Sequence, residues 1–354
     1  MDSAQLSTSI IIVLYNGQDY IQDCLAAVEG LGMPDLEVIV IDNSSSDNGA
    51  ALVTEHFPTV RLVRNPENIG FAAACNQGAA LAQGEVLAFL NQDTRVQPGW
   101  LKGLLAPLTQ DPQIGLTTSK LLFMSQPDKI NLCGLDVHYS GLSFGRGTLA
   151  PATGMEKAAP VSAVSGSAFA VRRPAWEKLG GFDTDYFMYY EDTDLSWRAW
   201  LAGYATWYVP ASCALHDAPL KPAHHALAFS TRNRPVLLLK TWKVPTLVLL
   251  TPGLLLAELA EWALMAVYGK AGLRAKARAI GWLLKNRGAI RARRRHTQNT
   301  RAKPDWYLLR QCSPVFKPVM IKDGVLGETL VGLVNAVLCL NYWFALTICR
   351  IGGI

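Results

Sequence analysis

Near its N-terminal end the chain carries the run Ile10-Ile11-Ile12-Val13-Leu14-Tyr15, which is continuously apolar and β-branched and is followed by Asn16. A run of this kind is typical of a strand that is buried on both faces, as in a parallel sheet. A helix-like stretch to about Glu29 comes next, and then a second apolar strand over residues 37–41, which ends at Asp42. The opening of the chain therefore predicts a βαβ unit.

The alternation of strand and helix patterns continues to residue 90. The polar turn 44–47 predicts the start of a helix toward His56, followed by a strand over 60–63, a helix over 71–82 and a strand over 86–90. Repeated βα units predict an α/β fold with a doubly wound parallel sheet, whose ligands bind at the carboxyl ends of the strands. We therefore expect the polar residues that follow these strands to line one edge of the sheet: Asn16, Asp42, Asn43, Asn68, Asn91, Gln92 and Asp93.

Charge divides the chain unevenly. The 354 residues suffice for one large domain and an extension, half of them are hydrophobic, and the net charge is +5. Residues 269–323 contain 15 Lys and Arg against two acids, a net charge of +13, which leaves −8 for the remainder. The composition also changes after Arg234. We expect an acidic catalytic domain over residues 1–235 and a basic, helical region over residues 236–354.

The cysteine pattern bears on the compartment. The seven cysteines are scattered, odd in number and never arranged as Cys-x-x-Cys. This argues against a disulfide framework and a zinc site, and it fits a reducing compartment. Because Ser9 leads directly into a strand, no signal peptide is expected, and the body of the protein is expected in the cytoplasm.

Three carboxylates fall within four residues in the run 189–198, at the expected start of a helix. They are Glu191, Asp192 and Asp194. Acids in a first helical turn complement the helix dipole, and Asp194 is spaced to pair with Arg198 four residues on. The cluster nevertheless holds one acid more than capping requires. Aromatic residues precede it and would desolvate a carboxylate and raise its pKa: Tyr186, Phe187, Tyr189 and Tyr190.

Three further positions have a structural interpretation beside a functional one. Asp42 stands where a dinucleotide fold keeps a ribose-binding acid, but the turn after the first strand lacks the glycine fingerprint. Asp42 either contacts a mononucleotide or caps a turn. Asp93 either binds a divalent cation together with a substrate diphosphate, or caps the helix after Pro98. His216, taken alone, is more often a structural residue.

Taken together, seven motifs are specific in their order and spacing. They are Val13–Asn16, Val40–Ser44, Asn65–Phe71, Leu90–Asp93, Gly166–Arg172, Gly180–Asp183 and Glu191–Leu195. In these motifs the chain resembles the inverting glycosyltransferases of family 2, and within them the bacterial rhamnosyltransferase-type members, over about residues 7–234. The resemblance implies the GT-A fold of nucleotide-diphospho-sugar transferases, a Rossmann-like mixed sheet flanked by helices, followed here by C-terminal membrane-associated helices.

The resemblance also implies roles for single residues. Tyr15, Asn16 and Asp42 would hold the nucleoside, and Asn68 would contact the donor. Asp93 matches the last position of the Asp-x-Asp metal motif of the family, whose first position is Asn91 here. This departure puts the affinity for metal in question, although an amide oxygen can still coordinate. The cofactor implied is Mg²⁺ or Mn²⁺.

The remaining implied roles concern the reaction itself. Asp192 matches the catalytic base, with Glu191 as the second candidate. His216 lies 24 residues beyond Asp192, where some members of the family supply a metal ligand. Gly166 and Tyr190 would contact the acceptor. The mechanism requires residues 93 and 192 to converge on one cleft.

Other functions remain possible at this stage. A nucleotidyltransferase also uses acids at strand ends and a metal, but it normally has a glycine-rich, basic loop after the first strand, and Gly17 alone does not supply one. A catalytically inactive, membrane-tethered carbohydrate-binding protein is a third possibility. Nucleic-acid binding is disfavoured because the basic region contains no stacking-aromatic module.

Two apolar runs, Val244–Tyr268 and Val325–Ile351, are each long enough to span a bilayer. A single crossing by the first run would place a segment of charge +13 outside, against the positive-inside rule. We expect the first run to lie in the interface or re-enter the membrane, continuing into the amphipathic stretch to Arg287. The last run either lies flat or crosses once. Four arginines would then contact anionic lipid headgroups: Arg291, Arg293, Arg294 and Arg295. The alternative is that this segment is a solvated, charged helix packed on the body of the protein.

These expectations define one leading function. The chain would transfer a sugar from a nucleotide donor to a polyprenyl-linked glycan at the cytoplasmic face of the inner membrane of a bacterium. Such a reaction belongs to the synthesis of a cell-surface polysaccharide such as an O-antigen or a cell-wall polymer. Subfamily resemblance favours dTDP-rhamnose as the donor, and the sequence leaves the donor, the acceptor and the linkage open.

Overall fold

The structure is a computed structural model that describes residues 6–33, 35–218, 224–316 and 325–354. Its contacts divide the chain into two compact units. The N-terminal unit comprises Met1–Leu135, Gly145–Ala199 and Tyr204–Lys221. The C-terminal unit comprises Asp136–Phe144, Trp200–Gly203 and Pro222–Ile354. The functional division at residue 235, into a catalytic and a membrane-associating part, stays a prediction.

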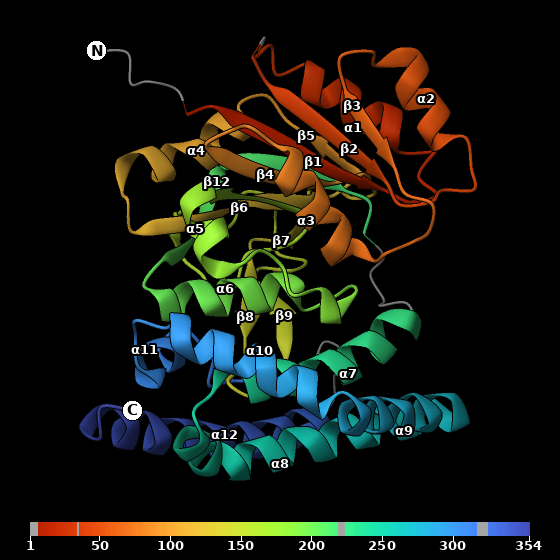
Figure 1. Ribbon diagram of the computed structural model, residues 1–354. Coiled ribbons are helices and arrows are strands. Elements are labelled where there is room, and N and C mark those ends of the chain that lie inside the picture. The colour runs from red at the N-terminus through yellow and green to blue at the C-terminus, as the bar shows by residue number, and fades with distance from the viewer. Residues whose placement is uncertain (1–5, 34, 219–223, 317–324) are drawn as a thin grey trace. The chain divides into compact units, whose positions relative to one another are not determined.

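A mixed β-sheet forms the centre of the N-terminal unit (Figure 1). Its strands are β1 (Thr8–Leu14), β2 (Glu37–Asp42), β3 (Arg61–Arg64), β4 (Val86–Asn91), β5 (Thr94–Val96), β6 (Ile114–Phe123), β7 (Ile130–Leu132), β10 (Ala159–Pro160), β11 (Ala168–Arg172) and β12 (Ala205–His216). Eight of them follow the order β10-β12-β6-β11-β4-β1-β2-β3, while β5 pairs with β12 and β7 with β6.

The sheet has two halves of different character. Strands β3, β2, β1 and β4 are mutually parallel, with Ile12 of β1 opposite both Val40 and Leu90. Strand β11 then runs antiparallel to both of its neighbours, β4 and β6. The first half confirms the βα alternation expected from the sequence, and the inserted antiparallel strand makes the sheet mixed, as the GT-A fold requires.

Helices cover both faces of this sheet. They are α1 (Ile21–Glu29), α2 (Gly49–His56), α3 (Phe71–Leu81), α4 (Trp100–Gln110), α5 (Arg173–Leu179) and α6 (Glu191–Ala202), with a 3₁₀ turn η1 (Thr184–Tyr186). Because side chains alternate along a strand, Ile10 and Ile12 pack in one core with α1, α2 and α4, whereas Ile11 meets α3. Gly78 on α3 permits that contact, since a Cβ there would lie 2.5 Å from Ile11 Cγ2.

The C-terminal unit is helical. It contains α7 (His224–Thr241), α8 (Val244–Val267), α9 (Gly269–Lys285), α10 (Arg287–Thr300), α11 (Asp305–Leu309) and α12 (Val325–Ile351), together with most of a hairpin of β8 (Leu135–Val137) and β9 (Ser143–Gly145). Within the described residues, the segments Val244–Val267 and Val331–Ile351 are long and apolar enough to cross a membrane, with hydropathies of 1.6 and 1.7. Length and composition alone do not distinguish spanning from lying flat.

Candidate functional site

The acidic cluster begins α6, and the backbone before it is strained. Phe187, Tyr189 and Tyr190 have φ angles of 63°, 64° and 75°, a region that bulky L-residues avoid at a cost of about 1–3 kcal/mol each. The N–H of Ala72 donates to the carbonyl of Phe187 at 3.2 Å. A Cβ at Gly70 would lie 2.6 Å from the Phe187 ring, so glycine is needed there. The first turn of α3 therefore helps to hold the segment that presents the acids.

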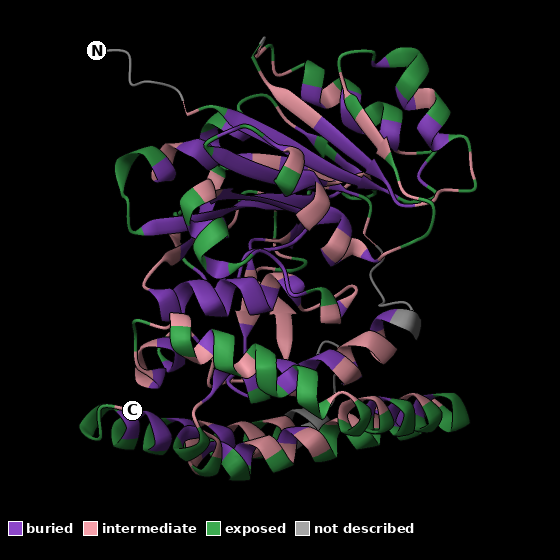
Figure 2. Ribbon diagram, in the orientation of Figure 1, coloured by how far each residue is buried: buried purple, intermediate pink, exposed green. Residues whose placement is uncertain are grey.

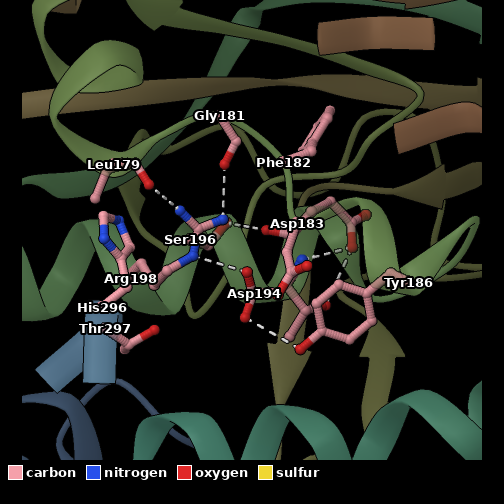
Figure 3. A network of polar contacts seen from close by, with 12 residues as sticks. Leu179, Gly181, Phe182, Asp183, Tyr186, Asp194, Ser196, Arg198, His296 and Thr297 are labelled. Carbon is pink, nitrogen blue, oxygen red and sulfur yellow. Dashed lines mark hydrogen bonds and ion pairs between the residues drawn. The ribbon is translucent and has the colours of Figure 1, made fainter. Parts of the chain in front are cut away.

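One of the three acids is structural. Asp194 is fully buried, and its Oδ2 atom accepts from Arg198 Nε at 2.7 Å, while its Oδ1 atom accepts from the Tyr186 hydroxyl at 3.1 Å (Figure 3). Arg198 also donates to the carbonyls of Leu179 and Gly181. The pairing between positions 194 and 198 that the sequence spacing indicated is confirmed. The remaining acids, Glu191 and Asp192, have no such cation.

Asp192 is held by neutral donors. Its Oδ2 atom accepts from the N–H of Gly166 at 2.9 Å, and its Oδ1 atom accepts from the N–H of Thr193 at 2.6 Å and from the Thr193 hydroxyl at 3.2 Å. A Cβ at Gly166 would lie 3.4 Å from Asp192 Oδ2 and 3.7 Å from Glu191 Oε1. Gly166 thus lies against both carboxylates, and it fixes one of them through its backbone.

The two neighbouring carboxyl groups differ in their surroundings. Burial, and next the charge of Asp192, raise the pKa of Glu191 well above its ordinary value, and Glu191 Oε2 is buried without a hydrogen-bond partner. Burial also raises the pKa of Asp192, but the donors at Gly166 and Thr193 act in the opposite direction. Two adjacent carboxyls in such unequal environments separate into an acid and a base. The raised pKa of Glu191 favours its protonated form, which leaves Asp192 as the better candidate for the ionised base.

A short hydrogen-bonded path connects this pair to the end of β4. The N–H of Asn91 donates to the carbonyl of Ser167 at 2.9 Å, and Asn91 Nδ2 donates to the Ser167 hydroxyl at 3.3 Å. Ser167 is the neighbour of Gly166, which binds Asp192. The pairing of β4 with β11 therefore brings the strand end that carries Asn91 next to the start of α6.

Asp93 lies beside His216. The distance from His216 Nε2 to Asp93 Oδ1 is 3.5 Å, and the N–H of Asp217 donates to the carbonyl of Asp93 at 3.0 Å. The other ring nitrogen of His216, Nδ1, lies 3.0 Å from Asn131 Oδ1. When Nδ1 donates to this amide oxygen, Nε2 is the ring nitrogen that faces the carboxylate of Asp93. The antiparallel pairing of β12 with β5 produces this arrangement, since His216 is opposite Thr94.

The residues at the end of β4 suit a divalent cation. Asn91 Oδ1 and Asp93 Oδ1 are buried without hydrogen-bond partners. Among the described residues no group of three or more His, Cys, Asp and Glu side chains forms a complete metal cage. Mg²⁺ is commonly bound by one or two carboxylates plus substrate phosphates rather than by an all-protein cage. The unpartnered oxygens and His216 Nε2 fit such an open site.

The nucleoside residues expected from the sequence occupy the ends of β1 and β2. Tyr15 is 46% exposed, and its N–H and carbonyl pair with the side-chain amide of Gln92 at 2.9 and 3.1 Å. A Cβ at Gly17 would overlap that amide, so glycine permits the approach. The Tyr15 ring is thereby left at the surface of the sheet edge, next to the strand end that carries Asp93.

Asn16 and Asp42 organise one loop between them. Asn16, with a φ of 47°, accepts through Oδ1 from the Ser46 N–H at 2.8 Å. Asp42 is 1% exposed, accepts from the Ser45 N–H at 2.9 Å and pairs with Arg64 Nε at 3.2 Å. These bonds show that Asp42 caps a turn, which was the structural role expected for it beside nucleotide binding. A direct contact between Asp42 and a nucleoside stays a prediction.

Asn68 takes part in a network of side-chain amides. Its Oδ1 atom accepts from Asn43 Nδ2 and from the Gly70 N–H, both at 2.9 Å. Asn43 Oδ1 in turn accepts from Asn65 Nδ2, and Asn65 and Gln77 exchange two bonds. The network fixes the loop before α3. A contact between Asn68 and the donor stays a prediction.

Some residues that shape the site were not singled out from the sequence. Asn131 orients His216, Ser167 links Asn91 to the Asp192 loop, and Ser45 is bonded to both Asn16 and Asp42. Ser167 belongs to the motif Gly166–Arg172 and Ser45 to the polar turn 44–47, whereas Asn131 belongs to no motif. The bonds to His216, Asn91 and Asn16 join segments that are distant along the chain, so the local sequence did not indicate them.

The four arginines expected at a membrane lie on α10 of the C-terminal unit. Arg291, Arg293 and Arg295 are exposed. Arg294 instead donates through Nη1 to the carbonyls of Leu239 and Trp242, the latter at 2.7 Å. Cations near a helix C-terminus satisfy its last carbonyls, which gives Arg294 a role in ending α7. The headgroup contacts stay a prediction.

Comparison with known proteins gives a sequence family. Residues 9–178 match the sequence model described as Glycosyl transferase family 2. An N-acetylglucosaminyl-diphospho-decaprenol L-rhamnosyltransferase of Mycobacterium tuberculosis is 28% identical over 246 residues, which cover 62% of this chain and 80% of the relative. The matched region contains both β4 and Gly166, and the rhamnosyltransferase match is long enough to include most of the N-terminal unit.

Solved structures show the same fold. A crystal structure of GalNAc-T7 with UDP, GalNAc and Mn²⁺ has a TM-score of 0.53 at 22% identity, covering 66% of this chain and 48% of that one. This chain thus spans about half of GalNAc-T7. The mannosyltransferase PcManGT from Pyrobaculum calidifontis, in complex with GDP-Man and Mn²⁺, has a TM-score of 0.51 at 18% identity, covering 98% of this chain and 88% of that one. The GT-A fold expected from the sequence is confirmed.

Proposed function

We propose, because the chain carries a glycosyltransferase family 2 domain over residues 9–178, that it transfers a sugar with inversion from a nucleoside-diphosphate donor to a hydroxyl group of a glycan. The observation that carries the mechanism is the unequal pair at the start of α6. Asp192 accepts from two backbone N–H groups, while burial raises the pKa of Glu191 beside it. Such a pair supplies one ionised base at the edge of the sheet.

The reaction is a single displacement. Asp192 Oδ takes the proton of the acceptor hydroxyl as the oxygen forms its bond to the anomeric carbon. The bond from that carbon to the diphosphate oxygen breaks at the same time, and the nucleoside diphosphate leaves with the electron pair. Attack from the face opposite the leaving group inverts the configuration. General-base catalysis of this kind contributes about 10²–10⁴-fold.

Asp93, Asn91 and His216 are the residues that would hold a divalent cation, Mg²⁺ or Mn²⁺. Bound there, the cation would act as a Lewis acid that neutralises charge on the departing diphosphate. The protein's own contribution is to keep the oxygens of Asn91 and Asp93 desolvated and to orient the His216 ring through Asn131. Tyr15, Asn16, Asp42 and Asn68 would bind the nucleoside part.

The donor proposed is dTDP-rhamnose. The support is the similarity, 28% identity over 246 residues, to the mycobacterial L-rhamnosyltransferase. Gly166 and Tyr190, which lie at or beside the acid pair, would contact the acceptor. That relative acts on an N-acetylglucosaminyl-diphospho-decaprenol, so the proposed acceptor is likewise a polyprenyl-diphosphate glycan.

A lipid-linked acceptor fits the rest of the chain. The C-terminal unit contains two helices long and apolar enough for a membrane, and it carries most of the excess positive charge. We place the enzyme at the cytoplasmic face of a bacterial inner membrane, in synthesis of a cell-surface polysaccharide such as a cell-wall polymer or an O-antigen. Nucleotide sugars are supplied on that side.

The test is a donor panel. Full-length protein is incubated with dTDP-rhamnose, UDP-GlcNAc, UDP-galactose and GDP-mannose, with Mg²⁺, Mn²⁺ or EDTA, and the release of nucleoside diphosphate is measured. We expect one donor to be consumed, in a reaction that EDTA abolishes, and dTDP-rhamnose to be that donor. Release from another sugar nucleotide would overturn the donor alone. Binding without release from any donor, with a lipid-linked acceptor present, would favour the inactive carbohydrate-binding protein.

A further inference from the structure

Helix α8 has its polarity reversed relative to a helix of a soluble protein. Its exposed side chains are apolar along the whole length, at the helical spacing: Val244, Val248, Leu255, Leu259, Trp262 and Val267. Their exposed fractions range from 37% for Trp262 to 83% for Val267. In a soluble protein the outer stripe of a helix is polar. The surface of α8 therefore suits an apolar medium.

The two charged residues of α8 contact the neighbouring helices, with the side chains of Glu261 and Glu258 9% and 36% exposed. Glu258 and Glu261 meet Arg234 of α7 and Lys276 of α9, and both cations are 2% exposed. Lys276 Nζ lies 2.7 Å from Glu258 Oε1 and 2.9 Å from Glu261 Oε2. Two cations and two anions balance within the unit. The cluster ties α7, α8 and α9 together.

Helix α12 shows the same reversal. Its exposed stripe over the described side chains is Leu333, Val337, Leu340, Phe344, Ile348 and Ile351. Asn341 faces the other way, where its Oδ1 atom accepts from the Gly253 N–H at 3.1 Å and its Nδ2 atom donates to the Leu249 carbonyl at 2.9 Å. Both partners belong to α8. The polar group of α12 is therefore used to bind α8, and its apolar groups are left outside.

Helix α9 adds positive charge beside an apolar stripe. Leu273, Ile280 and Leu284 are exposed. The helix also has four exposed cations: Lys270, Arg274, Arg278 and Lys285. Three of them directly follow an apolar residue, namely Leu273, Ala277 or Leu284, and one position corresponds to about 100° around the helix. An apolar stripe flanked by a cationic one is the pattern of helices that lie in the plane of a membrane interface.

These three helices are neighbours in one layer (Figure 1), since α8 packs against both α9 and α12. Figure 2 shows exposed residues gathered along all three. We call the outward stripes of α8, α9 and α12 together the apolar face. It contains 15 of the 19 large apolar side chains that are exposed in the described part of the chain.

We infer that the apolar face lies flat on the surface of an anionic lipid bilayer, with its side chains in one leaflet and neither α8 nor α12 crossing. The four exposed cations of α9 decide against crossing, because ion pairs hold α9 alongside α8 and a crossing would carry these cations into the hydrocarbon. At the interface the same cations meet lipid phosphates. This inference deepens the membrane part of the proposed function and rests on it.

Vesicle flotation of the full-length protein tests whether the apolar face binds an anionic bilayer, and it requires no sugar substrate. We expect binding to phosphatidylcholine vesicles that contain phosphatidylglycerol, and weaker binding without it. Leu259→Glu with Leu340→Glu should lower the bound fraction at least tenfold, whereas Leu149→Glu, at an exposed apolar residue of the N-terminal unit, should not. Arg274→Glu with Arg278→Glu should remove the dependence on phosphatidylglycerol, and Lys102→Glu should not. Unchanged far-UV circular dichroism and Tm establish that each variant is folded.

Labelling tests the orientation. Glu55→Cys in the N-terminal unit and Gly288→Cys on α10 are treated with a membrane-impermeant maleimide in sealed inside-out and right-side-out vesicles, with the unsubstituted chain as background. A flat arrangement predicts that both cysteines are labelled from the same side. Labelling from opposite sides would show that α8 crosses and would overturn the inference. A soluble dimer that does not bind vesicles would also overturn the inference, because its apolar face would be covered by a second copy of the chain. Donor hydrolysis can be normal in either case, so a failure of this inference is distinguishable from a failure of the proposed function.

Discussion

The two units both bury charge, but they balance it differently. In the C-terminal unit Arg234 and Lys276 face two glutamates, and every charge has an opposite partner. In the N-terminal unit Asp194 has Arg198, whereas Glu191 and Asp192 are adjacent acids for which the structure gives no cation. A balanced buried cluster holds helices together. An unbalanced one costs stability and is retained where a perturbed pKa is used.

The surfaces of the units differ as well. Of the 19 large apolar side chains exposed in the described residues, 17 belong to the C-terminal unit, and the N-terminal unit exposes Tyr15 and Leu149. The N-terminal unit therefore exposes few large apolar side chains, while the helical unit exposes many. These two patterns support the proposal that catalysis belongs to the N-terminal unit and membrane attachment to the C-terminal unit.

The largest expected effect is the loss of turnover when the carboxylate of Asp192, which has no cationic partner in the described residues, is replaced. Asp192→Asn keeps the size of the side chain and one acceptor oxygen, so it retains the bond from either Gly166 or Thr193 but not both, and it cannot take the proton of the acceptor. We expect turnover to fall by about 10²–10⁴-fold. Donor binding, measured by calorimetry, should stay within a few-fold of the unsubstituted protein.

The matched control is Glu177→Gln, which changes an exposed acid of α5 in the same unit and should leave turnover unchanged. Near-normal turnover in Asp192→Asn would remove this residue from the mechanism. If Glu191→Gln then abolished turnover instead, the base would be Glu191.

Breaking the ion pair between Asp194 and Arg198 should lower stability more than turnover. Asp194→Asn leaves the guanidinium of Arg198 buried without its carboxylate, which typically costs about 3–5 kcal/mol. We expect a large loss in the free energy of unfolding, measured by urea denaturation. Turnover per folded molecule, at a temperature where the variant is folded, should fall far less than in Asp192→Asn.

The cluster of the C-terminal unit should be more tolerant. Glu261→Gln removes one anion from Arg234 and Lys276, but Glu258 remains in contact with both cations. We expect a loss of about 1–3 kcal/mol in the free energy of unfolding. Thermal denaturation in detergent would measure it. A loss larger than that of Asp194→Asn would show that the two kinds of cluster do not differ as argued.

The smallest effect concerns pH. Because the pKa of Glu191 is raised, the folded protein binds this proton more tightly than the unfolded chain does, so its contribution to stability is lost as pH rises toward that pKa. Glu191→Gln has no such loss. We expect the Tm of this variant, relative to that of the unsubstituted protein, to rise as pH increases above the ordinary pKa of a glutamate. A relative Tm that falls as pH increases would contradict the raised pKa.

Much of the fold was predictable because its elements are marked locally. The apolar runs before Asn16, Asp42 and Asn91 indicated β1, β2 and β4, and the structure agrees to within two residues at each end. Strand β6 was missed because Thr117, Thr118, Ser119 and Lys120 interrupt its apolar pattern. All four are buried, since they bond to distant segments such as the carbonyls of Leu104 and Ala168.

The sequence indicated candidate site residues but not the contacts between them. Motif order indicated Asp93, Asp192 and His216, with Asp192 ranked ahead of Glu191, and these roles stay predictions. The physical difference between the two acids depends on the Gly166 N–H, which belongs to a loop 26 residues earlier in the chain. The orientation of His216 likewise depends on Asn131.

By itself, the sequence determined the strands and helices of the first 90 residues, the local pairing of Asp194 with Arg198, and the basic excess near the C-terminal end, because propensity, helical spacing and charge are properties of neighbouring residues. Only the tertiary structure decided which donors bind Asp192 and which side of each apolar helix faces outward. The Gly166 contact and the burial of a helix face depend on segments that are distant along the chain. For the same reason Glu258 and Glu261, which interrupt an apolar run in the sequence, leave the outer stripe of α8 uninterrupted in the fold.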